Sequence, residues 1–176
     1  MAIVPDSKDW TWVLERPCPE CRFDTSSVSL AGLPGLIGAN AAGWQEVLSG
    51  SGDLAARPAP DRWSALEYGC HVRDVFRLYD YRLSLMLSQD DPLFPNWDQD
   101  ETAVAERYDA QDPVTVAAEL AEAAGAIAAR FAVVEPGQLA RPGRRSDGAR
   151  FTVETFGRYF IHDPVHHLWD VTGRPL

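Results

Sequence analysis

The sequence has no apolar run long enough to cross a membrane. Its longest apolar windows are interrupted by Arg, Asp or Glu well before the roughly 20 residues that a transmembrane helix needs. The first ten residues also lack the basic segment followed by an apolar run that characterises a secretory signal. From these two absences we expect a cytoplasmic protein that has no membrane partner.

Positive charge is scarce as well. Lys and Arg number 16 against 26 Asp and Glu, which gives a formal net charge of −10. A chain with this balance repels nucleic acid overall, so we expect no nucleic-acid partner. The 176 residues suit a single core, because one domain commonly takes about 100 to 200 residues.

Cysteine is rare, and its count argues against disulfides. Cys18, Cys21 and Cys70 cannot all pair within one chain, and a reducing cytosol disfavours structural disulfides. Cys18 and Cys21 form a C-x-x-C pair, but a closed zinc site needs two further ligands and the sequence has no second C-x-x-C. We therefore interpret the pair as thiols in an ordered arm, with a peripheral metal or a disulfide as the minority alternative.

Alternating β-branched runs are almost absent, whereas apolar residues recur at helical spacing in four segments, residues 26–48, 64–88, 112–134 and 152–171. Ser64 and Glu67 form a capping box, and Pro34 predicts either a bend or the true start of the first helix. The pattern predicts an all-α four-helix bundle. We expect one domain over residues 26–176, preceded by an irregular arm over residues 1–25 that carries the C-x-x-C pair.

The connections between the predicted helices are long. Residues 90–112 form an acidic connection, with a short helix expected over 102–108, and connections of this length often serve as lids or binding loops. The composition of residues 135–150 favours a loop or short hairpin rich in arginine. Arg144 and Arg145 in this segment are candidates to bind an acidic group of a substrate.

The four histidines are the strongest candidates for chemistry. His162 and His166 are four residues apart and share one face of the last predicted helix, and a facing helix would add His71. Three protein ligands that leave a fourth position open are typical of a reactive metal centre. We therefore predict His71, His162 and His166 as metal ligands, with hydrogen-bonded core histidines as the alternative.

The register of the last helix leaves a second ligand pair open. Asp163 and His167 are also four residues apart, and Pro164 within the helix can kink it. Zinc is the first expectation for the metal, and nickel, manganese or iron are also compatible with imidazole-rich sites. If His162 and His166 are the ligands, His167 becomes a supporting group or proton carrier. Asp74 is a candidate to orient His71 or to move protons.

The segment Trp63-Ser64-Ala65-Leu66-Glu67 followed by His71, together with the late H-x-x-x-H, resembles the DinB/YfiT-like metalloprotein superfamily. That superfamily includes damage-inducible DinB proteins and the N-terminal domain of mycothiol-dependent maleylpyruvate isomerase. The resemblance covers roughly residues 24–171. It implies a four-helix bundle that holds a divalent metal on three side chains, with His71 as the second-helix ligand and His162 and His166 as the last-helix pair.

Two features depart from the family pattern, namely the proline inside the last ligand motif and the C-x-x-C arm. The superfamily includes thiol-dependent isomerases and transferases, and our leading hypothesis is a metal-dependent enzyme that deprotonates a low-molecular-weight thiol, such as mycothiol, or water at the open position. Addition to an electrophilic small molecule would then make it a transferase or isomerase. The alternative is a non-catalytic metal-binding or stress-related protein that acts as a dimeric binding module. The Trp-bearing arm would suit docking on a second copy, so a homodimer is compatible with either hypothesis.

Overall fold

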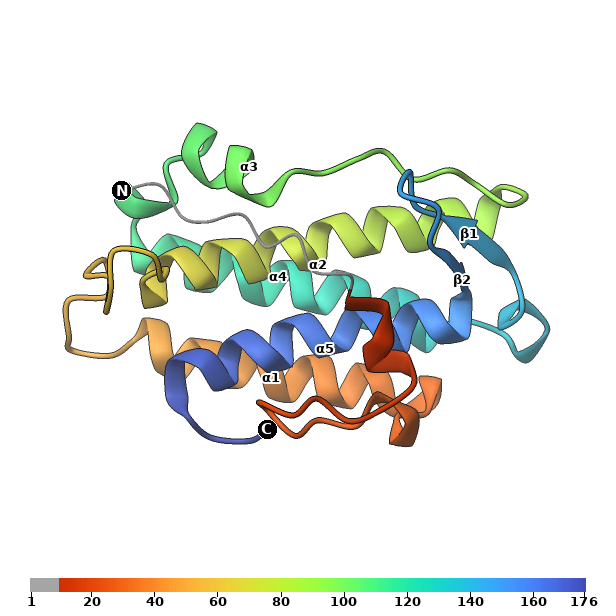
Figure 1. Ribbon diagram of the computed structural model, residues 1–176, viewed down its shortest axis with the longest axis horizontal. Helices are drawn as coiled ribbons and strands as arrows, with labels where there is room; N and C mark the ends of the chain where they lie inside the picture. The colour runs from red at the N-terminus through yellow and green to blue at the C-terminus, as the bar shows by residue number, and fades with distance from the viewer. Residues whose placement is uncertain (1–9) are drawn as a thin grey trace.

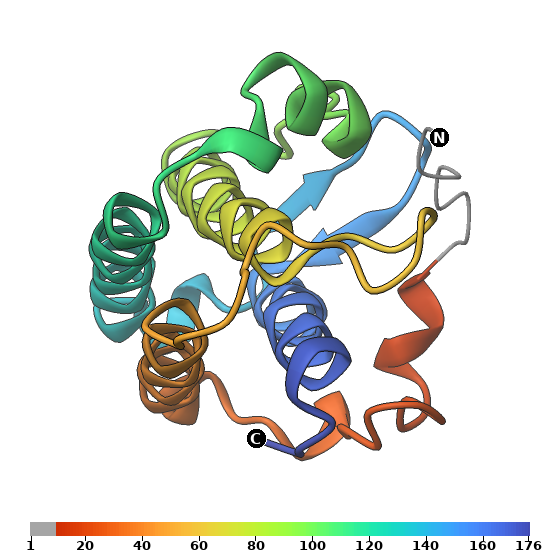
Figure 2. The same cartoon turned by 90° about the vertical axis from the view of Figure 1, so that its left-hand side faces the viewer.

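The computed structural model describes residues 10–176, so residues 1–9 of the expected N-terminal arm lie outside the described residues. Within the described part, the long helices are α1 (Leu33–Leu48), α2 (Ala65–Ser88), α4 (Pro113–Ala132) and α5 (Val153–Thr172). Helix α4 packs closely against α1 and α2, and α5 packs against both α1 and α2. The end-on view shows the four axes around a common core (Figure 2). This arrangement confirms the predicted four-helix bundle.

Local side-chain bonds explain where the long helices begin. Ser64 and Glu67 form the predicted capping box at the start of α2, and the side chain of Asp112 accepts a hydrogen bond from the backbone N–H of Thr115 at the start of α4. Helix α1 starts at Leu33 rather than near residue 26, because Pro34 suits the first turn of a helix but not its interior. Pro34 therefore marks the true start of the helix.

The shorter elements lie in the connections. Helix α3 (Gln99–Ala105) begins a few residues earlier than the predicted 102–108, because the carboxylate of Asp98 caps its first turn. The predicted hairpin forms from the antiparallel strands β1 (Pro142–Arg144) and β2 (Arg150–Thr152), beside the end of α2 and the start of α5 (Figure 1). Short 3₁₀ turns occur at Trp10–Leu14, Thr25–Ser27, Leu30–Gly32, Tyr108–Ala110 and Pro136–Gln138.

The extended segment between α2 and α3 is held against the hairpin and α2. The N–H of Phe94 donates to the carbonyl of Arg144 at 2.7 Å, and the N–H of Arg144 donates to the carbonyl of Pro92 at 2.9 Å. The guanidinium of Arg82 on α2 donates to the carbonyl of Pro95 at 3.1 Å. These bonds fix the path of the segment that carries Trp97 over the bundle.

The core is rich in aromatic side chains. Rings from α2, α4, α5, β2 and the extended segment meet in stacked, tilted or edge-to-face pairs at centroid separations of 5.0 to 6.0 Å. The buried members of this cluster are Phe76, Tyr79, Phe94, Phe131, Phe151, Phe156 and Phe160. Such contacts fix the relative positions of α2 and α5, on which the candidate ligands lie.

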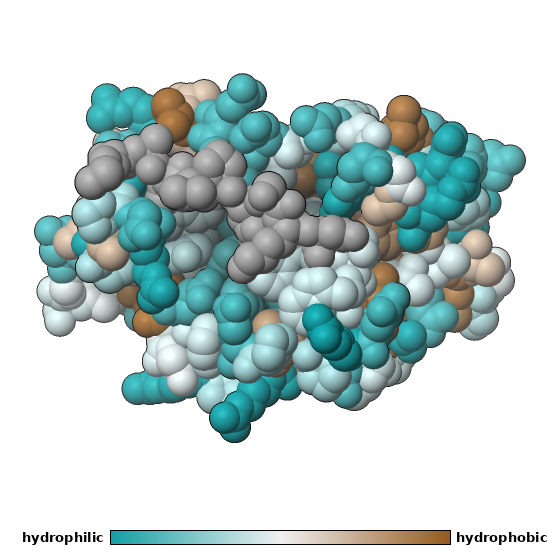
Figure 3. Space-filling model, in the orientation of Figure 1, coloured by the Kyte–Doolittle hydropathy of each residue, from teal (hydrophilic) through white to brown (hydrophobic). Residues whose placement is uncertain are grey.

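Polar residues cover most of the face shown in Figure 3, and apolar residues appear there only in small groups. The exposed large apolar side chains lie on separate elements, namely Tyr81, Leu93, Val104, Val114, Val133 and Leu176. No helix among residues 10–176 combines the length and the apolar character that a membrane span requires.

Gly157 lets α5 approach its neighbours closely. A Cβ atom at this position would lie 2.9 Å from Leu30 Cδ1 and 3.1 Å from both Leu33 Cδ2 and Phe131 Cε1. Gly38 on α1 is exposed, and a Cβ atom there would meet nothing within 4 Å among the described residues beyond its own helix. The two glycines therefore form a matched pair for testing the packing.

We expect Gly157→Ala to lower the free energy of unfolding by about 1–3 kcal/mol, because the added methyl group overpacks the interface of α5. Gly38→Ala should raise it by up to about 1 kcal/mol, because alanine favours the helix and meets no obstacle. Urea unfolding followed by circular dichroism measures both changes. Stabilisation by Gly157→Ala would contradict this packing.

A buried carboxylate holds the loop before α2. Glu67 accepts hydrogen bonds from the guanidinium of Arg57 and, at 2.8 Å, from the backbone N–H of Ser64. Burial by itself would raise the pKa of Glu67, but these donors outweigh it and hold the pKa below the ordinary 4.5. Glu67 is therefore ionised at neutral pH, and its charge stabilises the folded state.

We expect Glu67→Gln to lower the free energy of unfolding by about 1–2 kcal/mol at neutral pH, a modest value because Arg57 is partly exposed. Since the folded pKa lies below the unfolded one, the contribution of Glu67 is complete above 4.5 and is lost as the pH falls through the folded value. Urea titrations at pH 7 and about pH 3 should therefore show that the free energies of unfolding of wild type and Glu67→Gln differ less at the lower pH. The exposed Glu122→Gln is the control.

Candidate metal centres on helix α5

Two consecutive turns of α5 carry two pairs of candidate ligands. His162 and His166 form one pair, and Asp163 and His167 form the other. The helix continues through Pro164, whose carbonyl accepts a 2.8 Å hydrogen bond from Asn40 Nδ2 on α1. Since successive residues are about 100° apart around a helix, the two pairs face different neighbours. Pro164 does not break the register of either pair.

The first candidate centre consists of His71 on α2 and Asp163 and His167 on α5, whose ligand atoms all lie within 4.8 Å of one another. Asp163 Oδ1 lies 3.4 Å from His71 Nε2 and 3.9 Å from His167 Nε2. Oxygen and nitrogen ligands of a tetrahedral zinc ion lie about 3.4 Å apart, given bond lengths of about 2.0–2.2 Å. We call this group the open centre, because it offers three ligands.

The hydrogen bonding of the open centre fits a cation. Both ring nitrogens of His71 and Oδ1 of Asp163 are buried and have no hydrogen-bond partner among the described residues. Buried polar atoms are normally paired, and a cation bound between His71 and Asp163 would satisfy an atom of each. His167 Nδ1 lies 3.0 Å from Asp170 Oδ2, an outer carboxylate that directs Nε2 of His167 toward Asp163.

The charge of Asp163 also suits a metal ligand. Burial would raise its pKa, but the imidazoles of His167 and His71 outweigh this effect and hold the pKa of Asp163 well below its usual range. Asp163 is therefore a carboxylate at neutral pH, which is the state in which it can bind a cation.

Aromatic rings enclose the open centre on the α2 side. The ring of His71 lies 5.1 Å from Trp63 and is stacked 5.6 Å from Trp97, and Tyr68 lies 4.9 Å from His167, all between ring centroids. The side chain of Asp163 is nevertheless 36 % exposed. The centre is therefore walled on one side and accessible on the other.

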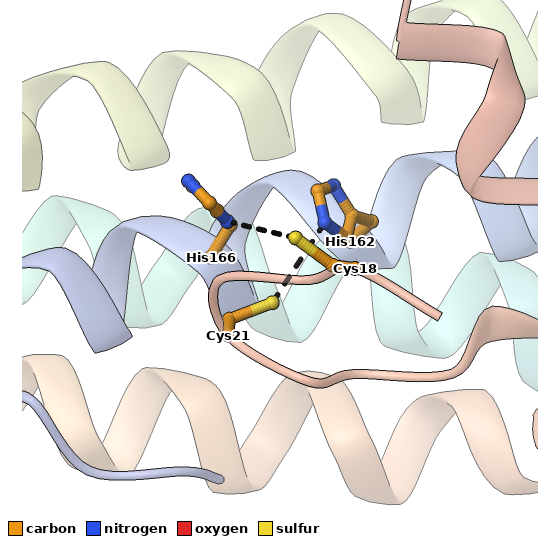
Figure 4. A group of neighbouring side chains, drawn as sticks. All are labelled: Cys18, Cys21, His162 and His166. Atoms are coloured by element: carbon orange, nitrogen blue, oxygen red, sulfur yellow. Dashed lines mark hydrogen bonds between the residues drawn. The ribbon is translucent and has the colours of Figure 1, made fainter. Parts of the chain in front are cut away.

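The second candidate centre consists of Cys18, Cys21, His162 and His166, all of them buried. Cys18 Sγ lies 3.7 Å from His166 Nδ1, and Cys21 Sγ lies 3.8 Å from His162 Nε2. Figure 4 shows both cysteine side chains pointing from the N-terminal arm toward the two imidazoles on α5. We call this group the Cys2His2 cluster.

The environment of the Cys2His2 cluster disfavours charge. Burial raises the pKa of the Cys21 thiol to about 12. Burial and the neighbouring imidazole of His166 lower the pKa of His162 to about 4. In the absence of a cation both groups are therefore neutral at pH 7.

The structure does not bring the three predicted metal ligands together. His71 lies with Asp163 and His167, whereas His162 and His166 lie with the cysteines of the arm. The alternative register of the last helix, Asp163 with His167, is the one that faces His71. His167 is accordingly a candidate ligand itself, because its ring points toward α2.

Asp74 does not contact His71, and the expectation that it orients this imidazole is wrong. It accepts hydrogen bonds from Arg73, Arg77 and Tyr108, because it lies on the side of α2 that faces α4 and the Tyr108 turn. Burial would raise the pKa of Asp74, but these donors hold it below its usual value.

The two predicted substrate-binding arginines lie at the hairpin. Arg144 is ion-paired with Asp91 at 3.0 Å, and Arg145 is ion-paired with Asp147. Arg145 also donates to the hydroxyl of Tyr159 at 2.6 Å, one turn before Asp163 on α5. Through this bond Arg145 is tied to the helix that carries the open centre, whereas Arg144 is not.

Cys18 and Cys21 are free, buried thiols in the ordered arm, as the sequence predicted. Their neighbours are His166 and His162, a pairing that the sequence did not predict. The two further ligands that a closed site would need are available as histidines spaced H-x-x-x-H, rather than as a second C-x-x-C. That combination of spacings is typical of Cys2His2 zinc sites, and it is present in the sequence. The prediction missed it because it grouped the same histidines with His71.

In one class of metalloproteins, the facing helices of a four-helix bundle direct nitrogen and oxygen ligands to one point. The candidate ligands of the open centre are arranged in this way. Residues 44–171 match the family model of the DinB superfamily, and the chain therefore belongs to that superfamily. This confirms the resemblance inferred from the residues around His71 and the late H-x-x-x-H.

A solved structure with the same fold is YfiT from Bacillus subtilis, which is described as a probable metal-dependent hydrolase with an unusual four-helix bundle topology. The two structures superpose with a TM-score of 0.74 over 84 % of this chain and 87 % of YfiT, at 19 % sequence identity. Among curated protein sequences, none matches this chain.

We expect Asp170→Asn to weaken Mn²⁺ binding at the open centre by about 10–100-fold, because the charged partner of His167 is lost while the shape is kept. Electron paramagnetic resonance measures free Mn²⁺ during a titration, and Mn²⁺ avoids thiolate ligands, so the Cys2His2 cluster does not contribute. Asp80→Asn, which removes the partner of Arg130 elsewhere on α2, is the control. Equal affinities for the two variants would contradict the role of Asp170.

Proposed function

We propose that the chain is a metal-dependent enzyme whose open centre, formed by His71, Asp163 and His167, activates a nucleophile. The observation that carries this proposal is the convergence of three ligands from two helices, two of which present buried atoms without hydrogen-bond partners among the described residues. Three ligands leave a coordination position for water or substrate, as in catalytic rather than structural sites.

When bound, a divalent ion supplies a nucleophile at neutral pH, because it strongly acidifies water or a thiol at its open position. The protein residues supply the geometry. His71 and His167 each present a ring nitrogen, and Asp163 presents Oδ1 with a negative charge. Asp170 holds the proton of His167 on Nδ1, which leaves Nε2 as the ligand atom.

The surroundings divide the open centre into a closed and an accessible side. Trp63 and Trp97 exclude water from the face of His71, which strengthens electrostatic interactions there. A substrate would approach past the exposed part of Asp163. Arg145, which donates to the hydroxyl of Tyr159 one turn before Asp163 and is also paired with Asp147, would attract an acidic group of that substrate.

The nucleophile distinguishes two reactions at the same centre. Water would make the chain a hydrolase, which agrees with the description of YfiT as a probable metal-dependent hydrolase. A low-molecular-weight thiol such as mycothiol would make it a transferase or isomerase acting on an electrophilic substrate, as the resemblance implies. The ligand set serves either nucleophile, with zinc as our first choice and nickel, manganese or iron as alternatives.

The test compares untagged wild-type protein with His71→Ala. We expect wild-type protein loaded with Zn²⁺, Mn²⁺ or Ni²⁺ to hydrolyse para-nitrophenyl acetate, or to join mycothiol to chlorodinitrobenzene, and a chelator to abolish the reaction. His71→Ala should lower the rate by at least about 100-fold, because several kcal/mol of transition-state stabilisation depend on the ion. The exposed Tyr81→Phe serves as the matched control.

Two results would overturn the proposal. One is an unchanged metal content after His71→Ala, which would show that the open centre does not bind the ion. The other is an open centre fully occupied by metal, together with rates in both assays that are unchanged by the chelator and by His71→Ala. That second result would favour the non-catalytic alternative, a metal-binding module of the same fold.

A further inference from the structure

We propose that Cys18, Cys21, His162 and His166 form a second metal site, a closed structural zinc site that fastens the N-terminal arm to α5. The proposal does not depend on the function assigned to the open centre. It rests on the geometry, the burial and the chain path of the Cys2His2 cluster.

The distances in the cluster match those around one tetrahedral zinc ion. Bond lengths of about 2.3 Å to sulfur and about 2.0–2.1 Å to nitrogen place a sulfur and a nitrogen ligand about 3.6 Å apart. The two measured sulfur-to-nitrogen distances are 3.7 and 3.8 Å, and all four ligand atoms lie within 4.8 Å of one another. Two thiols and two imidazoles are also ligands that zinc prefers.

The backbone of the arm is shaped to direct both sulfurs to one point. The N–H of Cys18 donates to the carbonyl of Phe23 at 3.0 Å, and the N–H of Arg22 donates to the carbonyl of Cys18 at 2.9 Å. Arg22 adopts the left-handed conformation, with φ of 63°, and this closes the turn. The resulting knuckle presents Cys18 and Cys21 on its inner side (Figure 4).

The contacts around His166 leave its Nδ1 for the ion. His166 faces Cys18 with Nδ1, while its Nε2 lies 3.5 Å from Glu20 Oε2 and 3.7 Å from Asp170 Oδ2. Outer carboxylates of this kind orient metal-binding imidazoles. The ring of Trp10 lies 5.6 Å from His162 and 5.5 Å from His166, so an aromatic side chain screens the cluster.

Thiol hydrogen bonds alone are a weaker account of the same arrangement. An S–H group is a poor donor, so two such bonds would add little to the other contacts that hold the arm, namely the buried side chains of Val13 and Val28 and the bond from Arg158 on α5 to the carbonyl of Val28. Four buried ligands without an open position are typical of structural zinc, whose binding energy stabilises the fold. A metal bound by the cluster would therefore add a strong link between the arm and α5 to these contacts.

The structural site would also support the open centre. His162 precedes Asp163 and His166 precedes His167, so fixing the first pair fixes the turns that carry the second pair. Asp170 lies near both centres, at 3.0 Å from His167 Nδ1 and 3.7 Å from His166 Nε2. The arm thus stabilises the helix that supplies two of the three ligands of the open centre.

Metal analysis and cobalt spectroscopy of the full-length, untagged protein test the proposal. We expect the double variant Cys18→Ser/Cys21→Ser to lose one equivalent of tightly bound zinc, and Co²⁺-loaded wild-type protein to show a thiolate-to-cobalt charge-transfer band that this variant lacks. His71→Ala should keep the band, because it removes only the open centre. Cys70→Ala, which removes the cysteine outside the cluster, should keep it as well.

Thermal unfolding measures the structural role of the site. We expect zinc removal, or the double variant, to lower the melting temperature by on the order of 10 °C, whereas Cys70→Ala tests the effect of losing an unrelated buried thiol. X-ray absorption of zinc-loaded His71→Ala keeps the proposal testable if the double variant fails to fold. Its zinc should have two sulfur and two nitrogen neighbours.

Three results would overturn the second site: a zinc shell without sulfur in His71→Ala, unchanged zinc content in the folded double variant, or a Cys18–Cys21 disulfide in the protein as purified under reducing conditions. These outcomes are distinct from failure of the proposed function. Loss of zinc in the double variant, together with no loss in His71→Ala, would remove the open centre and leave the structural site standing.

Discussion

The continuity of α5 through Pro164 is the constraint on which both centres depend. An α-helix places residues four apart on one face and consecutive residues about 100° apart. The four ligand positions on α5 therefore divide into two pairs that face different neighbours, α2 on one side and the N-terminal arm on the other. A break at Pro164 would destroy both pairs, and the bond from Asn40 to its carbonyl helps to hold the backbone there.

The two ligand sets differ in chemistry as well as in place. The open centre combines two imidazoles with a carboxylate and remains partly exposed, whereas the Cys2His2 cluster is buried and has four ligands. Soft thiolates favour zinc, and mixed nitrogen and oxygen ligands accept several divalent metals. The arm, which the matched family region of residues 44–171 does not include, thus adds a second kind of candidate site to a DinB bundle.

Local signals predicted the fold well. The capping box at Ser64, the Asp112-Pro113 start and the apolar periodicity act within a few residues, so they can be recognised without knowing the tertiary structure. Pro34 allowed two interpretations, and packing of the preceding segment as 3₁₀ turns decided between them. The family followed from the spacing of His71 and the late histidines, which the match to the DinB superfamily confirms.

The sequence by itself determined the bundle, the superfamily and the residue types that can bind metal, because periodicity, caps and ligand chemistry are local properties. Only the tertiary structure decided which ligands meet. A helix in a bundle can turn more than one of its faces toward a given neighbour. Rotation of α5 about its axis by one residue would put His162 in place of Asp163 on the face toward α2. Packing of α5 on α2 placed Asp163 and His167 beside His71, and docking of the arm placed Cys18 and Cys21 beside the remaining histidines.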